Sequence, residues 1–382
     1  MIFRILEDQF AQKIRETKDA DLRFMQLALA LGRRGQGRTW PNPAVGAVIV
    51  KDGVIVGRGW TQAGGRPHAE VEALRRAGTA ARGATLYVTL EPCSHFGKSP
   101  PCADAVIAAG IKRVVAAIED PNPDVAGQGH ARLRAAGITV DVGLRAAESA
   151  FDHAGHFRRI RDKRPHVILK LAVSPDDKIG AAGGKPVAIT GDSARNRVHL
   201  LRAQSDAILV GIGTVLADDP QLNCRLPGME ARSPVRVVLD RNLRIPASSQ
   251  LVRSARETPL WVISSELAEA AAATRLGAAG AQIMRMPPNS ASGLDLSAVL
   301  HALAEKGITR LMVEGGSRVA ASFVSADLVD EIWLFRGAEE VGTGGVDALD
   351  ALPLSKITQS QAYKVHASET FDKDTLTIYE RA

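Results

Sequence analysis

Two stretches, GRPHAEVEAL at residues 65–74 and EPCSHFGKSPPC at residues 91–102, decide how the first half of this chain is interpreted. The 382-residue chain has only three cysteines, yet Cys93 and Cys102 lie nine positions apart, shortly after His68. One imidazole and two thiolates are three ligands of a tetrahedral zinc ion, which leaves the fourth position for water. The pattern therefore predicts a zinc site built from His68, Cys93 and Cys102.

Glu70 follows His68 by two positions and is not needed as a metal ligand. In zinc nucleobase deaminases a glutamate at this spacing moves protons from the attacking water to the leaving amine, within an H-x-E…P-C-x-x-C pattern. The chain matches the His-Ala-Glu and Pro-Cys parts, but its second cysteine comes nine positions after the first, where the pattern has three. The alternatives are a closed structural zinc site with His95 as fourth ligand, or two cysteines that only pack.

The zinc motif falls at the ends of expected secondary-structure elements. Pro67 starts a predicted helix with His68 in its first turn. Cys93 follows a predicted buried strand, ATLYVTL, and Cys102 starts another helix behind two prolines. Helix N-termini favour negative charge, so we expect this position to support a thiolate.

Strands and helices alternate along the whole chain, which predicts an α/β protein. In the first half, AVGAVIVKDGVIVGRGW contains two apolar runs joined by Lys-Asp-Gly, a strong hairpin signal. The basic stretch FRRIRDKRPH, residues 157–166, is expected to link two domains, 1–163 and 164–382, with residues 1–18 as an N-terminal extension. In the second half the strand candidates are HVILKLAV, AILVGIG, VRVVLD, LWVISS, AQIMRM, RLMVEG and DEIWLF, and the helix candidates are DSARNRVHLLRAQ and GSRVAASFVSADL.

Composition narrows the class of protein. Hydrophobic residues make up 45% and charged residues 24%, as in ordinary globular proteins. The formal net charge of +6 is mild and suits a small anionic ligand, while an aromatic fraction of 4% does not favour a nucleic-acid-binding surface. The few cysteines, the charged N-terminus and the lack of a long apolar run favour a cytoplasmic location.

Several motifs together resemble those of one enzyme family. PNPAVGAVIV, GGRPHAEVEAL, EPCSHFGKSPPC and EDPNPDVAGQG are similar to the N-terminal half of bifunctional riboflavin-biosynthesis deaminase/reductases, and LRAQSDAILVGIGTVLADDPQLNCR and VEGGSRVAASF to the C-terminal half. The resemblance implies a cytidine-deaminase-like three-layer αβα domain and a dihydrofolate-reductase-like α/β domain. It also implies zinc-dependent hydrolytic deamination of 2,5-diamino-6-ribosylamino-4(3H)-pyrimidinone 5′-phosphate. NADPH-dependent reduction of the ribosyl group would then give 5-amino-6-ribitylamino-uracil 5′-phosphate.

The same resemblance assigns expected roles to residues of the deaminase. Glu70 is the expected catalytic residue, Asn42 is expected to face the base, and His95 and Lys98 are expected nearer the sugar phosphate. Asn42 lies between two prolines, so a turn residue without substrate contact is the alternative.

In the reductase, paired arginines suit a substrate phosphate, although an ordinary solvated charge is the alternative for Arg202. The glycines of VEGGSRVAASF precede a helix, where backbone amides can meet a cofactor phosphate, and Arg241 is expected to contact the 2′-phosphate of NADPH. The substrate residues implied by the resemblance are Lys170, Pro186, Arg202, Leu222, Arg225 and Glu314. The cofactor residues implied are Ala172, Ala188, Thr190, Thr214, Asp218, Arg241, Gly316, Ser317, Arg318, Val319, Ala320, Ala321 and Ser322.

The chain departs from the family pattern at a few positions. Residues 174–177 read SPDD where the family usually has SLDG. Pro186 and Ala188 stand where a serine and a tryptophan are usual, and Thr61 stands in place of a common histidine.

Two other functions remain open at this point. The C-terminal half of an active deaminase can serve only for binding or oligomerisation, and NADPH binding separates that case from the bifunctional enzyme. A nucleic-acid deaminase needs clustered basic residues near the zinc, and only Arg33, Arg34, Arg38 and Arg66 qualify. The expected ligands are one zinc ion per chain, NADPH and a phosphorylated pyrimidine, without nucleic acid or membrane. A homo-oligomer is compatible with the sequence.

Overall fold

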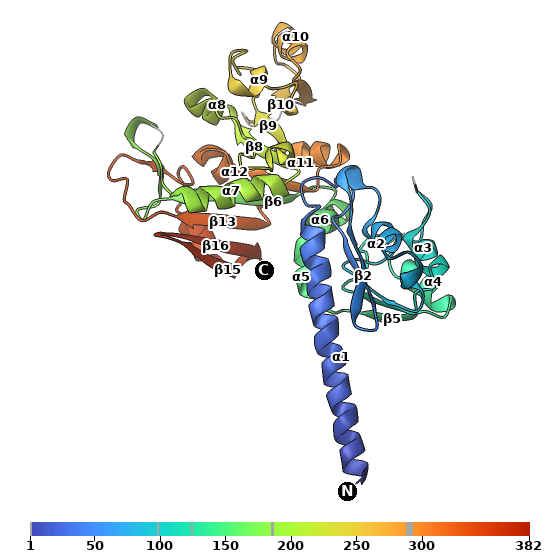
Figure 1. Cartoon of the computed structure of the whole chain (residues 1–382). Helices are drawn as coiled ribbons and strands as arrows, with labels where there is room; N and C mark the ends of the chain where they lie inside the picture. The colour runs from blue at the N-terminus through green and yellow to red at the C-terminus, as the bar shows by residue number, and fades with distance from the viewer. Residues whose placement is uncertain (1, 98, 124, 185–186, 288–292) are drawn as a thin grey trace. The chain divides into compact units, whose positions relative to one another are not determined.

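The computed structural model describes residues 2–97, 99–123, 125–184, 187–287 and 293–382 (Figure 1). The chain divides into two compact units, Met1–Asp162 and Lys163–Ala382. Among the helices of the described residues, none is long and apolar enough to cross a membrane.

A five-stranded sheet forms the centre of the first unit, in the order β2-β1-β3-β4-β5. Its strands are β1 (Gly46–Lys51), β2 (Val54–Trp60), β3 (Thr85–Val88), β4 (Arg113–Ala116) and β5 (Thr139–Val142). β1 is antiparallel to β2 and β3, whereas β3, β4 and β5 are parallel. The predicted hairpin is confirmed, because Asp52 and Gly53 both have positive φ angles, 50° and 78°, as a two-residue type I′ turn requires.

Helices cover both faces of this sheet and give three layers (Figure 1). α1 (Ile2–Arg33) packs on one face through Met25, Leu29 and neighbouring apolar side chains. It approaches β1 closely, because a Cβ at Gly46 would overlap the carbonyl oxygen of Ala28. The other face is covered by α2 (Ala69–Ala77), α3 (Cys102–Ala108) and α4 (Gln128–Ala135), with 3-10 turns at Ala63–Gly65 and Gly78–Ala81.

The prediction of a linker over residues 157–166 is wrong for most of that range. α5 (Ala146–Asp152) and α6 (Ala154–Asp162) end the first unit, and β6 (His166–Val173) begins the second. Phe157 is buried in α6, and the guanidinium of Arg161 lies 5.5 Å from the centroid of its ring. The basic residues therefore form the polar face of an amphipathic helix, and only residues 163–165 connect it to β6.

The second unit is built on a nine-stranded sheet in the order β11-β10-β9-β8-β12-β6-β13-β16-β15. The strands from β11 to β13 are parallel, and each overlaps a strand candidate of the sequence. β15 and β16 are antiparallel and are not predicted by the sequence patterns, because polar residues make up much of both strands. The strands are β6, β8 (Ala207–Gly211), β9 (Val235–Leu239), β10 (Leu260–Ser265), β11 (Gln282–Met286), β12 (Arg310–Val313), β13 (Glu331–Arg336), β15 (Tyr363–Phe371) and β16 (Asp374–Arg381).

Helices pack on this sheet around a buried apolar cluster that includes Ile168, Val210, Met312 and Phe335. α7 spans the predicted DSARNRVHLLRAQ, and α12 begins directly after the glycines of VEGGSRVAASF. The helices are α7 (Asp192–Gln204), α8 (Ile212–Asp218), α9 (Gln250–Arg253), α10 (Ala270–Ala278), α11 (Leu296–Glu305), α12 (Ser317–Ser325) and α13 (Ser355–Thr358), with 3-10 turns at Ala182–Gly184 and Glu230–Arg232. A two-stranded sheet pairs β7 (Lys178–Gly180) with β14 (Val346–Asp347).

The SPDD segment that departs from the family pattern forms a tight turn after β6. Ser174 Oγ accepts a hydrogen bond from the backbone N–H of Lys178 at 2.9 Å and donates to Asp176 Oδ1 at 2.6 Å. Asp177 has a φ of 61°, a left-handed conformation that glycine adopts freely and that aspartate tolerates better than most residues. The turn therefore forms without the glycine that is usual in the family.

Candidate active sites

Two helix N-termini and one loop bring the predicted zinc ligands together. His68 is the N-cap of α2, Cys102 is the first residue of α3, and Cys93 lies in the loop that follows β3. His68 Nδ1 lies 3.2 Å from Cys102 Sγ and 3.7 Å from Cys93 Sγ. Ligand atoms bound to one tetrahedral zinc at 2.0–2.3 Å lie roughly 3.5 Å apart, so the three side chains fit one ion.

The electrostatics of these side chains also fit a zinc ion. The backbone N–H of Cys102 donates to Cys93 Sγ at 3.3 Å. The hydrogen bond from the Cys102 thiol lowers the pKa of Cys93 to about 4, whereas that hydrogen bond and burial raise the pKa of Cys102. A lowered pKa favours the thiolate form of Cys93, and the nitrogen–sulfur donor set is the one that zinc prefers. The structure describes three ligands, as a catalytic zinc site requires.

Glu70 lies beside this group and differs from an ordinary surface carboxylate. It sits in the first turn of α2, and only 3% of its surface is exposed. Burial raises the pKa of Glu70 to about 7, although the positive charge of His68 opposes the shift. A carboxyl that can gain and lose a proton near neutral pH is suited to general acid–base work.

Glu91, two positions before Cys93, fixes the loop that carries this ligand. Its buried carboxylate accepts four backbone hydrogen bonds, two of them from Gly127 at 3.0 Å and Gly129 at 2.8 Å. A Cβ at Gly129 would overlap the carbonyl oxygen of Pro92. The sequence patterns do not identify Glu91 as an acceptor of backbone hydrogen bonds. The signal that could have found it is a glutamate directly after a buried apolar strand, in TLEPC.

A second group that could hold a metal ion lies nearby, formed by Glu91, Glu119 and His130. His130 Nδ1 lies 3.8 Å from a carboxylate oxygen of Glu91 and 3.9 Å from one of Glu119. The oxygens of Glu91 already accept backbone N–H groups, whose positive ends would face a cation. We therefore interpret Glu91 as a structural acceptor.

Of the substrate residues expected in the deaminase, the structure places Asn42 beside a glycine turn and His95 on the long loop between the cysteines. Asn42 Nδ2 donates to the carbonyl oxygen of Gly65 at 2.9 Å, so the side chain is fixed. Arg66 hydrogen-bonds Ser99 and ties the turn to the loop. His95 is exposed on that loop, and Lys98 lies outside the described residues.

Thr61 has a local role in this unit. Its buried Oγ1 accepts a hydrogen bond from the backbone N–H of Val45 at 3.0 Å. The hydroxyl thus completes the pairing beyond the ends of β1 and β2.

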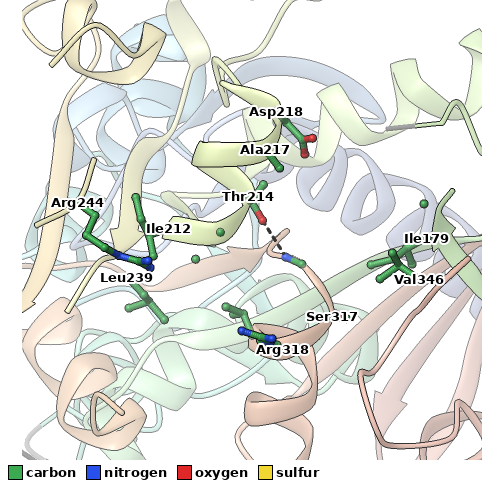
Figure 2. A pocket seen from close by; sticks show the side chains of 15 residues that line it. Ile179, Ile212, Thr214, Ala217, Asp218, Leu239, Arg244, Ser317, Arg318 and Val346 are labelled. Carbon is green, nitrogen blue, oxygen red and sulfur yellow. Dashed lines mark hydrogen bonds between the residues drawn. The ribbon is translucent and has the colours of Figure 1, made fainter. Parts of the chain in front are cut away.

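Three adjoining cavities lie along the carboxyl ends of the parallel strands in the second unit. A cavity of about 640 Å³ is lined by residues that follow β8 and β9 and by the N-terminus of α12 (Figure 2). It shares Ile179, Thr214, Asp218 and Gly316 with a cavity of about 350 Å³. On its other side it shares five lining residues with a cavity of about 300 Å³. Ligands of open α/β sheets bind at this edge.

A charged group forms one wall of the 350 Å³ cavity. Arg202 donates two hydrogen bonds to Glu314, both at 3.0 Å, and Lys170 Nζ lies 3.4 Å from the same carboxylate. Burial alone would raise the pKa of Glu314, but the charges of Arg202 and Lys170 hold the pKa of this carboxyl below its ordinary value. The group keeps one net positive charge, and Arg225 adds another, which suits a phosphorylated ligand.

The turn before α12 forms the floor between the two larger cavities. The backbone N–H of Gly316 donates to Thr214 Oγ1 at 3.1 Å, the contact drawn in Figure 2. A Cβ at Gly211 would come within 2.7 Å of Val319 Cγ2, so this glycine allows α12 to approach β8. The N-terminus of α12 lines the 640 Å³ cavity, and the N-terminus of a helix favours a bound anion.

The residues expected in the reductase separate into three groups. The 640 Å³ cavity is lined by Ser317, Arg318 and Val319, and also by Thr214, Asp218 and Gly316, which it shares with the 350 Å³ cavity. The 300 Å³ cavity is lined by Arg241 and Ser322. The side chains of Leu222 and Ala320 are buried in the interior, and Ala321 lines none of these cavities; Pro186 lies outside the described residues. The 350 Å³ cavity is lined by Lys170, Ala172, Ala188, Thr190, Arg202, Thr214, Asp218, Arg225, Glu314 and Gly316.

Other lining residues were not anticipated from the sequence. His199 of α7 lines the 350 Å³ cavity, and its Nδ1 accepts a hydrogen bond from the backbone N–H of Arg225 at 3.3 Å. Burial and the charges of Arg202 and Arg225 lower the pKa of His199 to about 4. Arg244 lines the two other cavities. A histidine or arginine between polar neighbours carries no sequence signal that separates it from a surface residue.

Comparison with known proteins agrees with this division into two sites. Residues 18–118 match the family described as cytidine and deoxycytidylate deaminase zinc-binding region, and residues 165–377 match the RibD C-terminal domain. The chain is 40% identical over 364 residues to riboflavin biosynthesis protein RibD of Aquifex aeolicus, covering 95% of this chain and 99% of that protein. It is 41% identical over 352 residues to RibD of Escherichia coli, covering 89% and 94%.

Solved structures give the same result. The chain superposes on a diaminohydroxyphosphoribosylaminopyrimidine deaminase/5-amino-6-(5-phosphoribosylamino)uracil reductase from Thermotoga maritima with a TM-score of 0.83 at 36% identity, covering 96% of this chain and all of the other. The TM-score is also 0.83 for RibD of Acinetobacter baumannii, at 35% identity, covering 96% and 99% of the two chains.

Proposed function

Because this chain belongs to the RibD family of bifunctional riboflavin-biosynthesis deaminase/reductases, we propose that its two units act in turn on one phosphorylated pyrimidine. The enzyme combines a zinc-binding deaminase region with an NADPH-dependent reductase domain. Residues 1–163 are assigned to deamination and residues 164–382 to reduction, a division that lies one residue from the one between the two compact units. The observation that carries the assignment is the presence of the His68–Cys93–Cys102 group in one unit and three adjoining cavities in the other.

The substrate is 2,5-diamino-6-ribosylamino-4(3H)-pyrimidinone 5′-phosphate, which loses its 2-amino group as ammonia. The ribosyl group is then reduced to ribityl, giving 5-amino-6-ribitylamino-uracil 5′-phosphate. The reaction names carried by the Thermotoga maritima relative support this pair of steps. A small phosphorylated metabolite also agrees with the cationic lining of the 350 Å³ cavity.

In deamination the protein residues bind the base and move protons. A zinc ion held by His68, Cys93 and Cys102 supplies Lewis-acid activation of water. Glu70 takes one proton from the attacking water and delivers it to the ring nitrogen. It then takes the second proton from the hydroxyl added to the ring carbon and delivers it to the amine, which leaves as ammonia while the carbonyl forms. Asn42, fixed by Gly65, faces the base. His95, on the loop between the two cysteines, contacts the sugar phosphate, and Lys98 has the same role by the family resemblance.

In the reduction step the protein binds NADPH and the substrate next to each other. NADPH supplies the hydride. Lys170, Arg202 and Glu314 bind the substrate in the 350 Å³ cavity, with Arg225 toward its phosphate. The wall at Thr214 is shared by the two cavities, which supports a nicotinamide end of the cofactor next to the substrate. The two thiolate ligands of the zinc favour a reducing compartment such as the cytoplasm.

The test follows ammonia release and NADPH oxidation together, in purified zinc-loaded enzyme given the diaminopyrimidinone ribotide. We expect one ammonia per substrate, followed by one NADPH oxidised. Ammonia without NADPH oxidation would instead favour a deaminase whose second unit only binds. If the enzyme released no ammonia and oxidised no NADPH, the assigned substrate would be wrong.

A further inference from the structure

A short loop, residues 222–225, carries Arg225 to the wall of the 350 Å³ cavity. It lies between α8 and β9 in the sequence. Leu222 and Cys224 are buried, whereas Asn223 and Arg225 alternate with them and reach the surface. The Arg225 guanidinium donates to Asn223 Oδ1 at 3.1 Å. The position of this guanidinium therefore depends on what holds the main chain of the loop.

Two side chains of α7 hold the loop by its main chain. His199 Nδ1 accepts a hydrogen bond from the backbone N–H of Arg225 at 3.3 Å. Arg202 donates to the carbonyl oxygen of Asn223 at 3.1 Å. Residues three positions apart lie on the same face of a helix, and both of these side chains line the 350 Å³ cavity. The helix thus contacts the main chain on both sides of Cys224.

The loop needs such contacts because it belongs to no helix or strand. The backbone N–H of Cys224 donates to Ser233 Oγ at 3.1 Å, so a side chain replaces regular main-chain pairing here too. Leu222 has a φ of 54°, a left-handed conformation that is rare for a bulky residue. Such a conformation costs free energy and persists where the surrounding structure fixes it. The bond from Arg225 to His199 is one of the contacts that fix this segment.

The imidazole of His199 is neutral near pH 7, as an acceptor has to be. Burial and the positive charges of Arg202 and Arg225 lower its pKa to about 4, while the charge of Glu314 and a hydrogen bond with the backbone of Asn223 act in the opposite direction. Because Nδ1 accepts, the proton of the neutral ring lies on Nε2. The charged side chains that share the cavity wall with His199 are Lys170, Arg195, Arg202, Asp218, Arg225 and Glu314.

We propose that His199 is a positioning residue of the reductase, which holds the main chain of Arg225 so that the guanidinium meets the phosphate of the substrate. The inference rests on the proposed reductase function. His199 acts through Arg225 and takes no part in hydride transfer. The phosphate is bound equally in the substrate and in the transition state, so losing this contact raises KM and leaves kcat unchanged.

Steady-state kinetics of the full zinc-loaded chain, with NADPH and the deaminated intermediate, test the proposal. His199→Leu removes the acceptor and keeps most of the bulk, and it should raise KM about fivefold with less than about a twofold change in kcat. His199→Asn should bring KM back to within about twofold of the wild type, because Asn Oδ1 is bonded to Cγ as His Nδ1 is. His301→Leu, at an exposed position on α11, is the matched control and should change neither constant.

A double variant separates positioning from a direct substrate contact of His199. Arg225→Ala removes the guanidinium but keeps the backbone N–H, so it raises KM on its own. In that background His199→Leu should change KM less than about twofold, because the group that it positions is already gone. The Kd of NADPH, measured by fluorescence titration, should stay within about twofold of the wild type in every variant and reports that the second unit is folded. His199→Ala replaces the leucine variant if the latter binds no NADPH.

Three results, each in a variant that binds NADPH normally, would overturn the proposal. They are an unchanged KM in His199→Leu, a KM that His199→Asn does not restore, and effects of His199→Leu and Arg225→Ala that multiply in the double variant. The wild type separates these failures from a wrong reductase assignment. A wild type that oxidises no NADPH on the deaminated intermediate contradicts the reductase itself, whereas an active wild type with any of the three results contradicts the role of His199 alone.

Discussion

Glu314 holds Arg202 through both carboxylate oxygens, with Arg202 Nε donating to Oε2 and the terminal NH2 donating to Oε1, each at 3.0 Å. The pair forms at the carboxyl end of β12, where Val313 lies opposite Leu169 of the parallel strand β6. The next residue of β6, Lys170, therefore reaches the same carboxylate. One anion thus fixes two cations in the cavity assigned to the substrate.

Glu314→Gln should remove this arrangement while leaving the first unit intact. Two cations would lose their partner in a site where their side chains are only 11–15% exposed. Removing one partner of such a pair costs about 2 kcal/mol or more, so we expect kcat/KM of the reductase to fall at least about thirtyfold. NADPH oxidation on the deaminated intermediate measures this. Equal loss of ammonia release would contradict the separation of the sites.

Cys93→Ser should abolish stoichiometric zinc binding, because the described part of the chain brings three ligands together and the variant loses one of them. Metal content per chain, measured by atomic absorption, should fall from about one zinc ion to near none. Cys224→Ser is the matched control, because Cys224 is a buried free cysteine of the second unit. If the Cys224 variant lost the zinc and the Cys93 variant kept it, the assigned ligand set would be wrong.

Gly129→Ala tests the contact that fixes the Cys93 loop. The added Cβ would overlap the carbonyl oxygen of Pro92 and press on the Glu91 carboxylate. Overpacking of this kind costs about 1–3 kcal/mol, so the unfolding midpoint in urea should fall and zinc should dissociate faster. Gly277→Ala is the control: a Cβ there meets no atom within 4 Å, and alanine in α10 should be neutral or stabilising. If the two variants had the same unfolding midpoint and the same rate of zinc loss, the contact of Gly129 with Pro92 would not fix the Cys93 loop.

His199 should make the chain lose stability on the acid side of neutrality. The pKa of His199 is lowered to about 4 from an ordinary value of 6.5, so the unfolded chain binds this proton at a higher pH than the folded chain does. Acidification from about pH 6.5 to pH 4 therefore favours unfolding. His199→Gln should show a smaller fall in melting temperature between pH 7 and pH 5 than the wild type.

The control for this comparison is His301→Gln, in an exposed position on α11 of the same unit. It should leave the difference between the two pH values unchanged. A wild-type fall that His199→Gln does not reduce would mean that other groups govern acid unfolding.

The zinc site and most strands were predictable because local patterns dictate them. A hairpin signal, proline at helix starts and the spacing of His68, Cys93 and Cys102 each act within a few residues, and the structure agrees with them. The expected fold class and bifunctional identity are also confirmed by the comparisons. The basic helix at residues 154–162 was missed because charge alone does not separate a linker from an amphipathic helix.

The remaining features depend on contacts between distant segments. Glu91 receives hydrogen bonds from residues 29 to 39 positions away, and no local pattern reports that pairing. The positions of Arg244 and His199 on cavity walls emerge only when the strands and helices of the second unit pack together. The reductase residues expected by resemblance stay predictions until binding is measured.

A mixing experiment tests the central claim that two separate sites act in sequence on one metabolite. Glu70→Gln should keep its zinc but lose ammonia release by about 100-fold or more, and so should oxidise no NADPH from the diaminopyrimidinone ribotide. Glu314→Gln should release ammonia and stop there. A mixture of the two variants should carry out both reactions, because the intermediate can pass from one protein to the other. NADPH oxidation by Glu70→Gln alone, or no ammonia from Glu314→Gln alone, would contradict the account.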